Sequence, residues 1–292
     1  METSQLAPHR GARIDLPGRH GPIAALHAKA DGVDPDTTVL LLPGYTGSKE
    51  DFAPLLDPIA DAGFDVVAVD LPGQYESAGP ELESDYLTVP LGATFVELIG
   101  KLAADGRKVL LLGHSYGGLV ARAAVLAGAD VAMLTLLDSG PASLPNGLRR
   151  MVLEAADPHL RQHGVHAVQQ IREQVAAQAP DWELRSAELK EFLRTRLVRS
   201  TEPGLLGMSA GLRTEPDRVD ELAAVLRERA IGAHVLTGQN DDAWSLDAQR
   251  DMARRLGAPF TTVPGAGHSP NTENPEGLLA VLLPAWREHG AR

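Results

Sequence analysis

The stretch of residues 108–128, KVLLLGHSYGGLVARAAVLAG, constrains the fold of this chain more than any other. It begins with a continuous apolar run that is typical of a buried strand and ends in a pattern that is typical of a helix. Ser115 lies between them, with Gly113 two residues before it and Gly117 two residues after it. Side chains at those two positions would collide around so tight a corner, and glycine relieves the crowding. The stretch therefore predicts a helix packed onto a buried sheet, with a serine held at the corner.

Short apolar runs alternate with helical stretches along the rest of the chain. We expect strands at 21–28, 37–42, 64–70, 108–113 and 131–138, and again at 233–238 and 259–265. We expect helices over 52–63 and 89–106, directly after Ser115, and over 274–290. The interior runs are almost wholly apolar, as in strands that helices cover on both faces. This alternation predicts an α/β fold with a doubly wound, mostly parallel sheet.

The pattern changes between residues 141 and 230, where strand signals vanish. Residues 148–178 and 186–200 instead read as amphipathic helices, and acidic and basic residues balance across the segment. We therefore predict a core domain of residues 1–140 and 231–292, with a helical cap of residues 141–230 inserted before the last strands. A cap over the strand ends would cover the place where such sheets bind ligands. The alternative is a helical layer that lies away from any site.

Composition excludes several classes of partner. The net charge of −12 and the absence of lysine clusters argue against nucleic acid. With no cysteine, the chain has no disulfide and no thiolate metal site. The N-terminal residues 1–18 resemble no signal peptide, and charged residues interrupt the longest apolar region, 109–137. We expect a cytoplasmic protein that binds a small molecule and no membrane, and a homodimer is left open.

Three polar residues follow predicted strands and suit nucleophilic catalysis. The sequence GHSYG, residues 113–117, matches the G-x-S-x-G nucleophile elbow, in which a serine hydroxyl stands at the start of a helix. Serine needs a base, and His268 in the glycine-rich loop VPGAGHSP can supply one. Asp241 in LTGQNDDAW can orient the imidazole by accepting its N–H. Ser115, Asp241 and His268 are thus the candidate catalytic triad.

The order of these residues along the chain resembles that of the α/β-hydrolase superfamily, and the resemblance extends over nearly the whole chain outside residues 141–230. LLLPGYTGSKEDF, residues 40–52, looks like the family's first βα loop, with Pro43 at the usual histidine. The resemblance implies an eight-stranded sheet and an oxyanion hole formed by the N–H groups of Tyr45 and Tyr116. In VDLPGQYES, residues 69–77, Tyr75 stands where the family usually has glycine.

Several alternatives remain open at this stage. Asp138, in LTLLDSGP, occupies the place of the acid in some members of the superfamily, although the setting of Asp241 is the more usual one. His159, His163 and His166 have a spacing that could suggest a metal site, but a polar helix face is the simpler interpretation. We expect neither a metal nor a cofactor.

The expected activity is hydrolysis of a carboxylic ester in a small, mainly apolar and uncharged substrate. A thioesterase, an amidase, a carbon–carbon bond hydrolase and a non-catalytic binding protein are the alternatives, because one fold serves many functions. The stretch PGLLGMSAGL, residues 203–212, shows no clear helical period, so it could turn Leu205, Leu206 and Met208 toward a pocket. Trp244 could form the facing wall.

Overall fold

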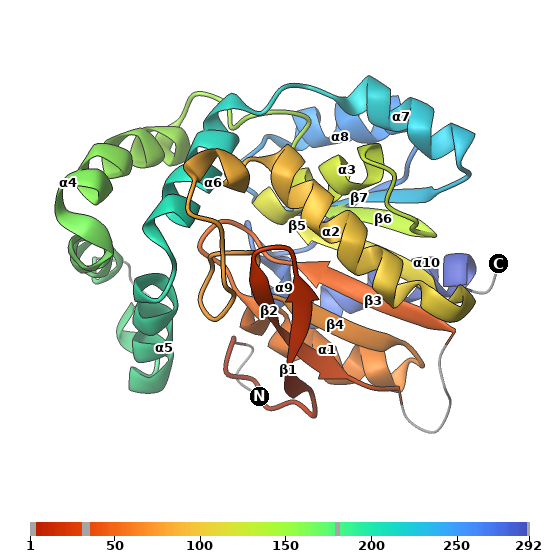
Figure 1. Cartoon of the computed structure of the whole chain (residues 1–292), viewed down its shortest axis with the longest axis horizontal. Coiled ribbons are helices and arrows are strands. Elements are labelled where there is room, and N and C mark those ends of the chain that lie inside the picture. Colours follow the sequence, from red (N-terminus) through yellow and green to blue (C-terminus); the bar gives the residue numbers. More distant parts are fainter. Residues whose placement is uncertain (1–3, 31–35, 179–181, 291–292) are drawn as a thin grey trace.

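Eight strands form one sheet in the computed structural model, which describes residues 4–30, 36–178 and 182–290 (Figure 1). Their order across the sheet is β1-β2-β4-β3-β5-β6-β7-β8. β2 pairs antiparallel with both β1 and β4, and all other neighbours are parallel. The expected α/β fold with a mostly parallel sheet is confirmed. The strands are β1 (Ala12–Gly18), β2 (Gly21–Ala28), β3 (Thr37–Leu42), β4 (Asp65–Val69), β5 (Lys108–His114), β6 (Met133–Leu137), β7 (Gly232–Gly238) and β8 (Phe260–Val263).

Helices cover both faces of the sheet. α2, α3, α7 and α8 pack on one face, and α1 and α10 pack on the other. The α-helices are α1 (Ala53–Asp61), α2 (Thr88–Leu102), α3 (Tyr116–Leu126), α4 (Leu148–Ala176), α5 (Ala187–Val198), α6 (Glu202–Thr214), α7 (Val219–Glu228), α8 (Leu246–Leu256), α9 (Pro270–Glu273) and α10 (Pro275–Gly290). Short 3₁₀-helices lie at η1 (Lys49–Phe52), η2 (Glu83–Tyr86), η3 (Ala104–Gly106) and η4 (Trp182–Leu184).

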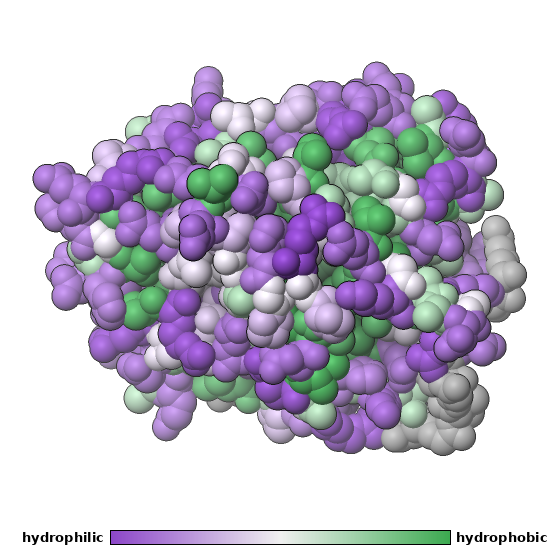
Figure 2. All heavy atoms as spheres, viewed as in Figure 1, coloured by the Kyte–Doolittle hydropathy of each residue, from purple (hydrophilic) through white to green (hydrophobic). Residues whose placement is uncertain are grey.

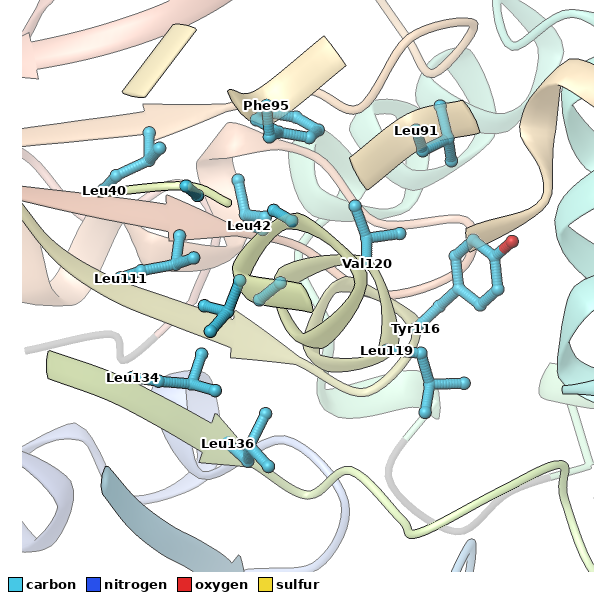
Figure 3. Close-up of a cluster of buried hydrophobic side chains, with 14 of the residues drawn as sticks. Leu40, Leu42, Leu91, Phe95, Leu111, Tyr116, Leu119, Val120, Leu134 and Leu136 are labelled. Carbon is cyan, nitrogen blue, oxygen red and sulfur yellow. The ribbon is translucent and has the colours of Figure 1, made fainter. Parts of the chain in front are cut away.

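Alternate residues of the central strands build the core on the first face (Figure 3). Leu40 and Leu42 of β3 and Leu111 of β5 lie in one cluster with Phe95 of α2 and Val120 of α3, and all five are fully buried. The intervening strand residues join a second cluster with α1 and α10. Because successive side chains of a strand point to opposite faces, burial on both sides requires the continuous apolar runs seen in the sequence.

The edge strand β1 is absent from the strands expected on sequence grounds. It pairs with β2 through a hairpin at Gly18 and Gly21, and its residues alternate between exposed and half-buried. Ile14 and Leu16 are the apolar residues that pack against the core. An edge strand with one half-buried face needs no continuous apolar run, so the pattern carries little signal.

The chain between β6 and β7 forms α4, α5, α6 and α7, which confirms a helical insertion before the last strands. α4, α5 and α6 lie together at one end of the molecule (Figure 1). α7 instead packs on α3 and α8, as part of the layer that covers the sheet. The domain boundaries at 140 and 231 stay a prediction, and residues 1–3 and 179–181 lie outside the described part of the chain.

The glycine-rich stretch 203–212 is helical, which corrects the expectation of an irregular segment. It forms most of α6, and in this stretch the glycines, not the apolar residues, recur at helical spacing. A Cβ atom on Gly207 would lie 2.2 Å from the Glu83 carbonyl oxygen, and one on Gly211 would lie 2.4 Å from the Tyr116 hydroxyl. These glycines therefore allow α6 to approach the core closely, and this packing offsets their low helix propensity.

None of the described helices has the length and apolar character needed to span a membrane. On the face shown in Figure 2, hydrophilic residues dominate and hydrophobic residues lie between them in small groups. Three exposed apolar side chains, Leu148, Met151 and Val152, lie together at the start of α4. Two of them, Leu148 and Val152, also line the cavity described below.

Candidate active site

The corner between β5 and α3 holds Ser115 in a strained backbone conformation. Its φ is 53° and its ψ is −119°, a region that non-glycine residues rarely occupy. A Cβ atom on Gly113 would lie 2.3 Å from the Gly117 carbonyl oxygen, and one on Gly117 would lie 2.4 Å from the Pro43 carbonyl oxygen. A side chain at either glycine would force the corner apart. The sequence pattern at this corner thus reflects a steric requirement.

Ser115, His268 and Asp241 form a continuous series of contacts. The hydroxyl Oγ of Ser115 lies 3.0 Å from Nε2 of His268, and Nδ1 of His268 lies 2.7 Å from Oδ1 of Asp241. Asp241 follows β7 and His268 follows β8, so two neighbouring strands bring the acid and the imidazole together. With Nδ1–H donating to the carboxylate, Nε2 is free to accept the serine proton.

The Asp241 carboxylate is held by further donors. The backbone N–H of Ala243 donates to its Oδ1 at 3.0 Å, and the side chain of Gln249 on α8 donates to its Oδ2 at 2.8 Å. Burial by itself would raise the pKa of Asp241. The pKa is nevertheless lowered, because the hydrogen bond and charge of His268, together with these two donors, favour the carboxylate. Gln249 is fully buried and carries no sequence motif, so sequence analysis missed it.

Asp138, the alternative acid, lies beside this triad at the end of β6. Its Oδ1 accepts hydrogen bonds from the N–H of Gly238 at 2.8 Å and the hydroxyl of Thr237 at 3.1 Å. Single ligand atoms of Asp138, Asp241 and His268 all lie within 4.8 Å of one another. Burial raises the pKa of Asp138 well above its usual value, and the charge of Asp241 adds to the rise. The geometry thus pairs His268 with Asp241, whereas the carboxyl group of Asp138 bonds Gly238 and Thr237.

The loop after β3 lies against Ser115 and offers backbone donors. A Cβ atom on Gly44 would lie 3.0 Å from Cβ of Ser115. Within the described residues, no hydrogen bond occupies the backbone N–H of Tyr45 or that of Tyr116. Tyr116 is the first residue of α3, where an N–H has no acceptor within the helix. Two free donors beside a serine hydroxyl can stabilise an oxyanion that forms there.

Gln74 fixes the position of this loop. Its Nε2 donates to the Gly44 carbonyl oxygen at 2.8 Å and contacts Sδ of Met208 on α6 at 3.6 Å. Its Oε1 accepts the N–H of Leu71 at 3.2 Å. Gln74 is 1% exposed, so these contacts are shielded from water. It lies in the loop PGQYES after β4, but the sequence gives no sign that its amide reaches the loop after β3.

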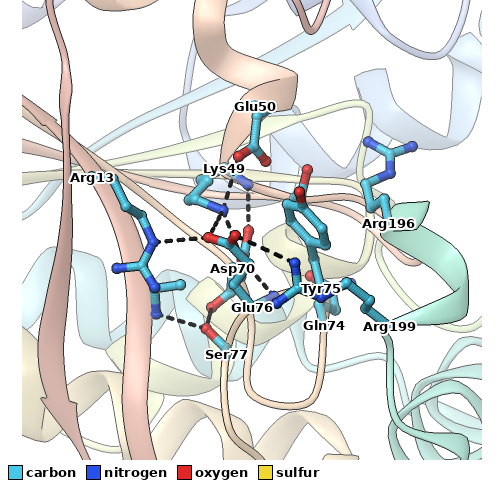
Figure 4. A network of polar contacts seen from close by, with 12 residues as sticks. Arg13, Lys49, Glu50, Asp70, Gln74, Tyr75, Glu76, Ser77, Arg196 and Arg199 are labelled. Atoms are coloured by element: carbon cyan, nitrogen blue, oxygen red, sulfur yellow. Dashed lines mark hydrogen bonds and ion pairs between the residues drawn. The ribbon is translucent and has the colours of Figure 1, made fainter. Parts of the chain in front are cut away.

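A buried ion-pair network connects the loop after β3 to the loop after β4 (Figure 4). Nζ of Lys49 lies 3.1 Å from Oδ2 of Asp70, 2.8 Å from Oε1 of Glu50 and 2.9 Å from Oε2 of Glu76. The Lys49 side chain is 1% exposed and that of Asp70 is 0% exposed. Lys49 begins η1, directly after the loop that carries Tyr45, so the network ties this loop to the loop after β4.

Tyr75 keeps the turn that the family usually makes with glycine. Its φ is 41°, in the left-handed region that favours glycine. Its ring packs edge-on against Phe192 of α5, with the centroids 5.8 Å apart, and Nζ of Lys49 lies 4.5 Å from the ring centroid. Contacts to the cap and to the buried ammonium group therefore compensate for the strained backbone.

His114 packs against His268. Its Nε2 donates to the carbonyl oxygen of His268 at 2.7 Å, and the two ring centroids lie 5.2 Å apart. Burial lowers the pKa of His114 to about 4, and the neighbouring His268 contributes to the lowering. His114 is therefore neutral near neutral pH, and its role here is to hold a backbone carbonyl.

A cavity of about 470 Å³ opens above Ser115, between the sheet and the cap. Ser115 and His268 lie in its wall, together with Tyr45 and the tip of the loop after β7. Much of the remaining wall is apolar and comes from Leu144, Leu153, Leu160, Val168, Leu205 and Leu212. A small organic molecule fits such a volume, with its reacting group at Ser115.

Three of the four expected pocket residues do not line this cavity, which corrects that part of the sequence-based assignment. Met208 packs in the main core beneath Gln74, and Leu206 packs among the cap helices. Trp244 is 2% exposed, and its indole N–H donates to the carbonyl oxygens of Ala142 and Ser143, where the chain enters the cap. The fourth, Leu205, lines the cavity as expected, and the helical period of α6 adds Leu212 to the same wall.

The histidines of the cap lie along α4. The rings of His159 and His163 are 4.5 Å apart, and His163 and His166 are exposed. Asp242, next to the acid of the triad, is 66% exposed at its side chain and pairs with Arg149 of α4 at 2.6 Å. It thus links the loop after β7 to the start of the cap.

The sheet order, the corner serine and the inserted helices together define an α/β-hydrolase. The sequence profile of the Alpha/beta hydrolase family matches residues 39–281, and the chain belongs to this family. Curated relatives from Escherichia coli, named 2-succinyl-6-hydroxy-2,4-cyclohexadiene-1-carboxylate synthase, are 28% to 30% identical to the chain. The alignments cover 90% of this chain and 99% of the relatives.

Solved structures share the fold at lower sequence identity. An esterase from Thermogutta terrifontis superposes with a TM-score of 0.72 at 22% identity, covering 97% of this chain and 100% of the esterase. MenH from S. aureus superposes with a TM-score of 0.71 at 17% identity, covering 91% of this chain and 98% of MenH. An N-acyl homoserine lactonase, AidH, gives a TM-score of 0.71 at 18% identity, covering 95% and 97% of the two chains.

Proposed function

We propose that this protein is a serine hydrolase that cleaves a carboxylic ester of a small molecule through an acyl-enzyme. The observation that carries the proposal is the series of contacts from Asp241 through His268 to Ser115, beside two free backbone N–H groups. A serine hydroxyl becomes nucleophilic only when a base within hydrogen-bond reach takes its proton. His268 meets that condition at 3.0 Å.

The reaction proceeds in two matched steps. His268 accepts the proton of Ser115 while Oγ attacks the ester carbonyl carbon, and the carbonyl oxygen becomes an oxyanion held by the N–H groups of Tyr45 and Tyr116. The imidazolium, stabilised by Asp241, then donates its proton to the departing alcohol. Water attacks the acyl-enzyme by the same route, and its hydrogen returns through His268 to Ser115.

A second candidate comes from the curated relatives. Their printed name describes formation of a cyclohexadiene carboxylate, and they align with almost the whole chain. The same site could serve such a reaction, because His268 can move a proton whether or not Ser115 is acylated. The esterase and lactonase among the structural neighbours support ester cleavage as the first candidate.

A fluorophosphonate probe tests the acyl-enzyme directly. The wild-type protein should be labelled at Ser115, and Ser115→Ala should remove the label while the protein stays folded. A panel of p-nitrophenyl esters of increasing acyl length, run beside thioesters and amides, identifies the bond that is cleaved. Labelling that persists in Ser115→Ala would contradict the assignment of the nucleophile. Formation of the relatives' named product, with no turnover of any ester, would favour the second candidate.

A further inference from the structure

The cavity contains a cation that has no counter-charge. Arg172 lies on the second half of α4, after Gly164, whose φ of 76° breaks the helix. Arg172 lines the same cavity as Ser115. Within the described residues, its guanidinium has neither a hydrogen bond nor an ion pair. The Arg172 side chain is exposed at the cavity wall, so its unpaired N–H groups are open to an anion that enters the cavity.

The other acidic residues and arginines that line the cavity are paired. Asp51 bonds Arg196 at 2.5 Å, Asp242 bonds Arg149 at 2.6 Å, and Asp157 bonds Arg213. Arg172 therefore leaves the cavity with one uncompensated positive charge. Arg172 is also close enough to Arg196 for the two charges to repel, and the ion pair that Asp51 makes is with Arg196.

Tyr45 places a second free donor next to this charge. Its hydroxyl has no hydrogen-bond partner among the described residues, and its ring lies in the cavity wall. Burial raises the pKa of Tyr45 to about 12, so the hydroxyl keeps its proton, while the neighbouring Arg172 acts in the opposite direction. Arg172 keeps its positive charge, because a guanidinium stays protonated in proteins.

We propose that Arg172 and the Tyr45 hydroxyl form a subsite for a carboxylate on the substrate. The inference rests on the proposed function and names its substrate class: an ester that carries a free carboxylate, joined to the scissile carbonyl by a short apolar chain. Tyr45 sets the distance between the scissile carbonyl and the carboxylate of the substrate. Its backbone N–H would bind the oxyanion, and its side chain ends at the subsite. This replaces the uncharged substrate expected from the sequence.

The charge at the subsite favours a carboxylate over a phosphate. A guanidinium binds either group through paired N–H donors. Only one positive charge is unpaired here, and Asp51 and Asp157 also line the cavity. These carboxylates would repel the second charge of a phosphate monoester, whereas a monoanion matches the single free cation.

Monomethyl suberate and dimethyl suberate test the subsite, because they differ only in the terminal carboxylate. The wild-type enzyme should show the higher kcat/KM for the monomethyl ester. Arg172→Gln should lower that kcat/KM by about 10- to 100-fold, as expected for loss of a hydrogen bond between charged groups, and leave dimethyl suberate nearly unchanged. Tyr45→Phe should cause a smaller loss of the same preference. Arg172→Lys should keep part of the preference, because lysine supplies the positive charge but not the paired N–H donors of a guanidinium.

Arg161→Gln is the matched control. Arg161 lies on the same helix and its side chain is 53% exposed, where it pairs with Glu83. The variant removes the same charge from α4 but not from the cavity, so its ratio of kcat/KM values should equal that of the wild type. If Arg172→Gln leaves the ratio unchanged, or changes it no more than Arg161→Gln does, the carboxylate subsite is wrong and ester hydrolysis still stands.

A binding measurement separates the subsite from the chemistry. Monomethyl suberate is titrated by calorimetry into Ser115→Ala and into Ser115→Ala combined with Arg172→Gln. Weaker binding by about 10-fold or more in the double variant supports the subsite even if no ester is turned over, and only the proposed function then fails. Equal binding in both proteins, or no binding in either, overturns the subsite whatever the hydrolysis assays show.

Discussion

Asp138 and Asp241 bring carboxyl groups to one buried space beside His268, yet only Asp241 is bonded to the imidazole, at 2.7 Å. The two residues follow the neighbouring strands β6 and β7. The pKa of Asp241 is lowered, which favours the carboxylate that an imidazolium needs, whereas burial and the charge of Asp241 raise the pKa of Asp138. The pKa values of these two neighbouring carboxyl groups are thus shifted in opposite directions.

The first prediction separates the two acids. Asp241→Asn should lower kcat by about 10⁴-fold, because an amide at this position favours the wrong histidine tautomer. Asp138→Asn should have a small effect, since the amide oxygen can still accept from Gly238 and Thr237. The measurement is kcat on one ester for both variants, with circular dichroism to show that each is folded. A larger loss in Asp138→Asn would move the acid to β6.

The second prediction distinguishes cavity residues from packing residues on α6. Leu205→Ala should change the ratio of kcat/KM for short and long acyl chains, because each pocket methylene contributes about 1 to 3 kcal/mol to discrimination. Met208→Ala should lower kcat/KM for all substrates by one common factor. It should also reduce the free energy of unfolding by about 2 to 5 kcal/mol. Steady-state kinetics and urea unfolding test this, and an altered chain-length preference in Met208→Ala would count against it.

The third prediction concerns stability in acid. The pKa of His114 is about 4 in the folded protein and about 6.5 when the residue is unfolded. The unfolded chain therefore binds the extra proton between these values, and the free energy of unfolding falls as the pH drops from 6.5 to 4, by roughly 3 kcal/mol for this residue. His114→Gln should flatten the fall. Urea unfolding of both proteins across this range measures the difference, which would vanish if His114 titrated normally.

The fourth prediction concerns the ammonium group of Lys49. Lys49→Met should destabilise the fold by about 3 to 5 kcal/mol, because it leaves buried carboxylates without their counter-charge. Arg19→Gln is the comparison: Arg19 pairs with Glu97 at a site where both side chains are nearly half exposed, so its loss should cost about 0.5 kcal/mol or less. Equal melting temperatures for the two variants would show that the network contributes no more than a surface pair.

The parts of this protein that the sequence predicts are those with local causes. The continuous apolar runs of β3 and β5 follow from burial on both faces, and the glycines around Ser115 follow from the crowding of one corner. The order of Ser115, Asp241 and His268 identifies three loops that parallel strands bring to the same edge of a sheet. Such features require only the chain's own geometry.

Tertiary structure decided the features that depend on which distant side chains meet. Gln74 and Gln249 act through amides that reach across loops. The sequence offered both Leu205 and Met208 for the pocket, and only Leu205 lines the cavity, because the glycines of α6 fix the rotation of the helix. Charge pairing is decided in the same way. The sequence shows acidic and basic residues in balance across the cap, but only the folded structure shows that Asp51 satisfies Arg196 and leaves Arg172 unpaired above Ser115, because pairing depends on distances of a few ångströms between residues far apart in the chain.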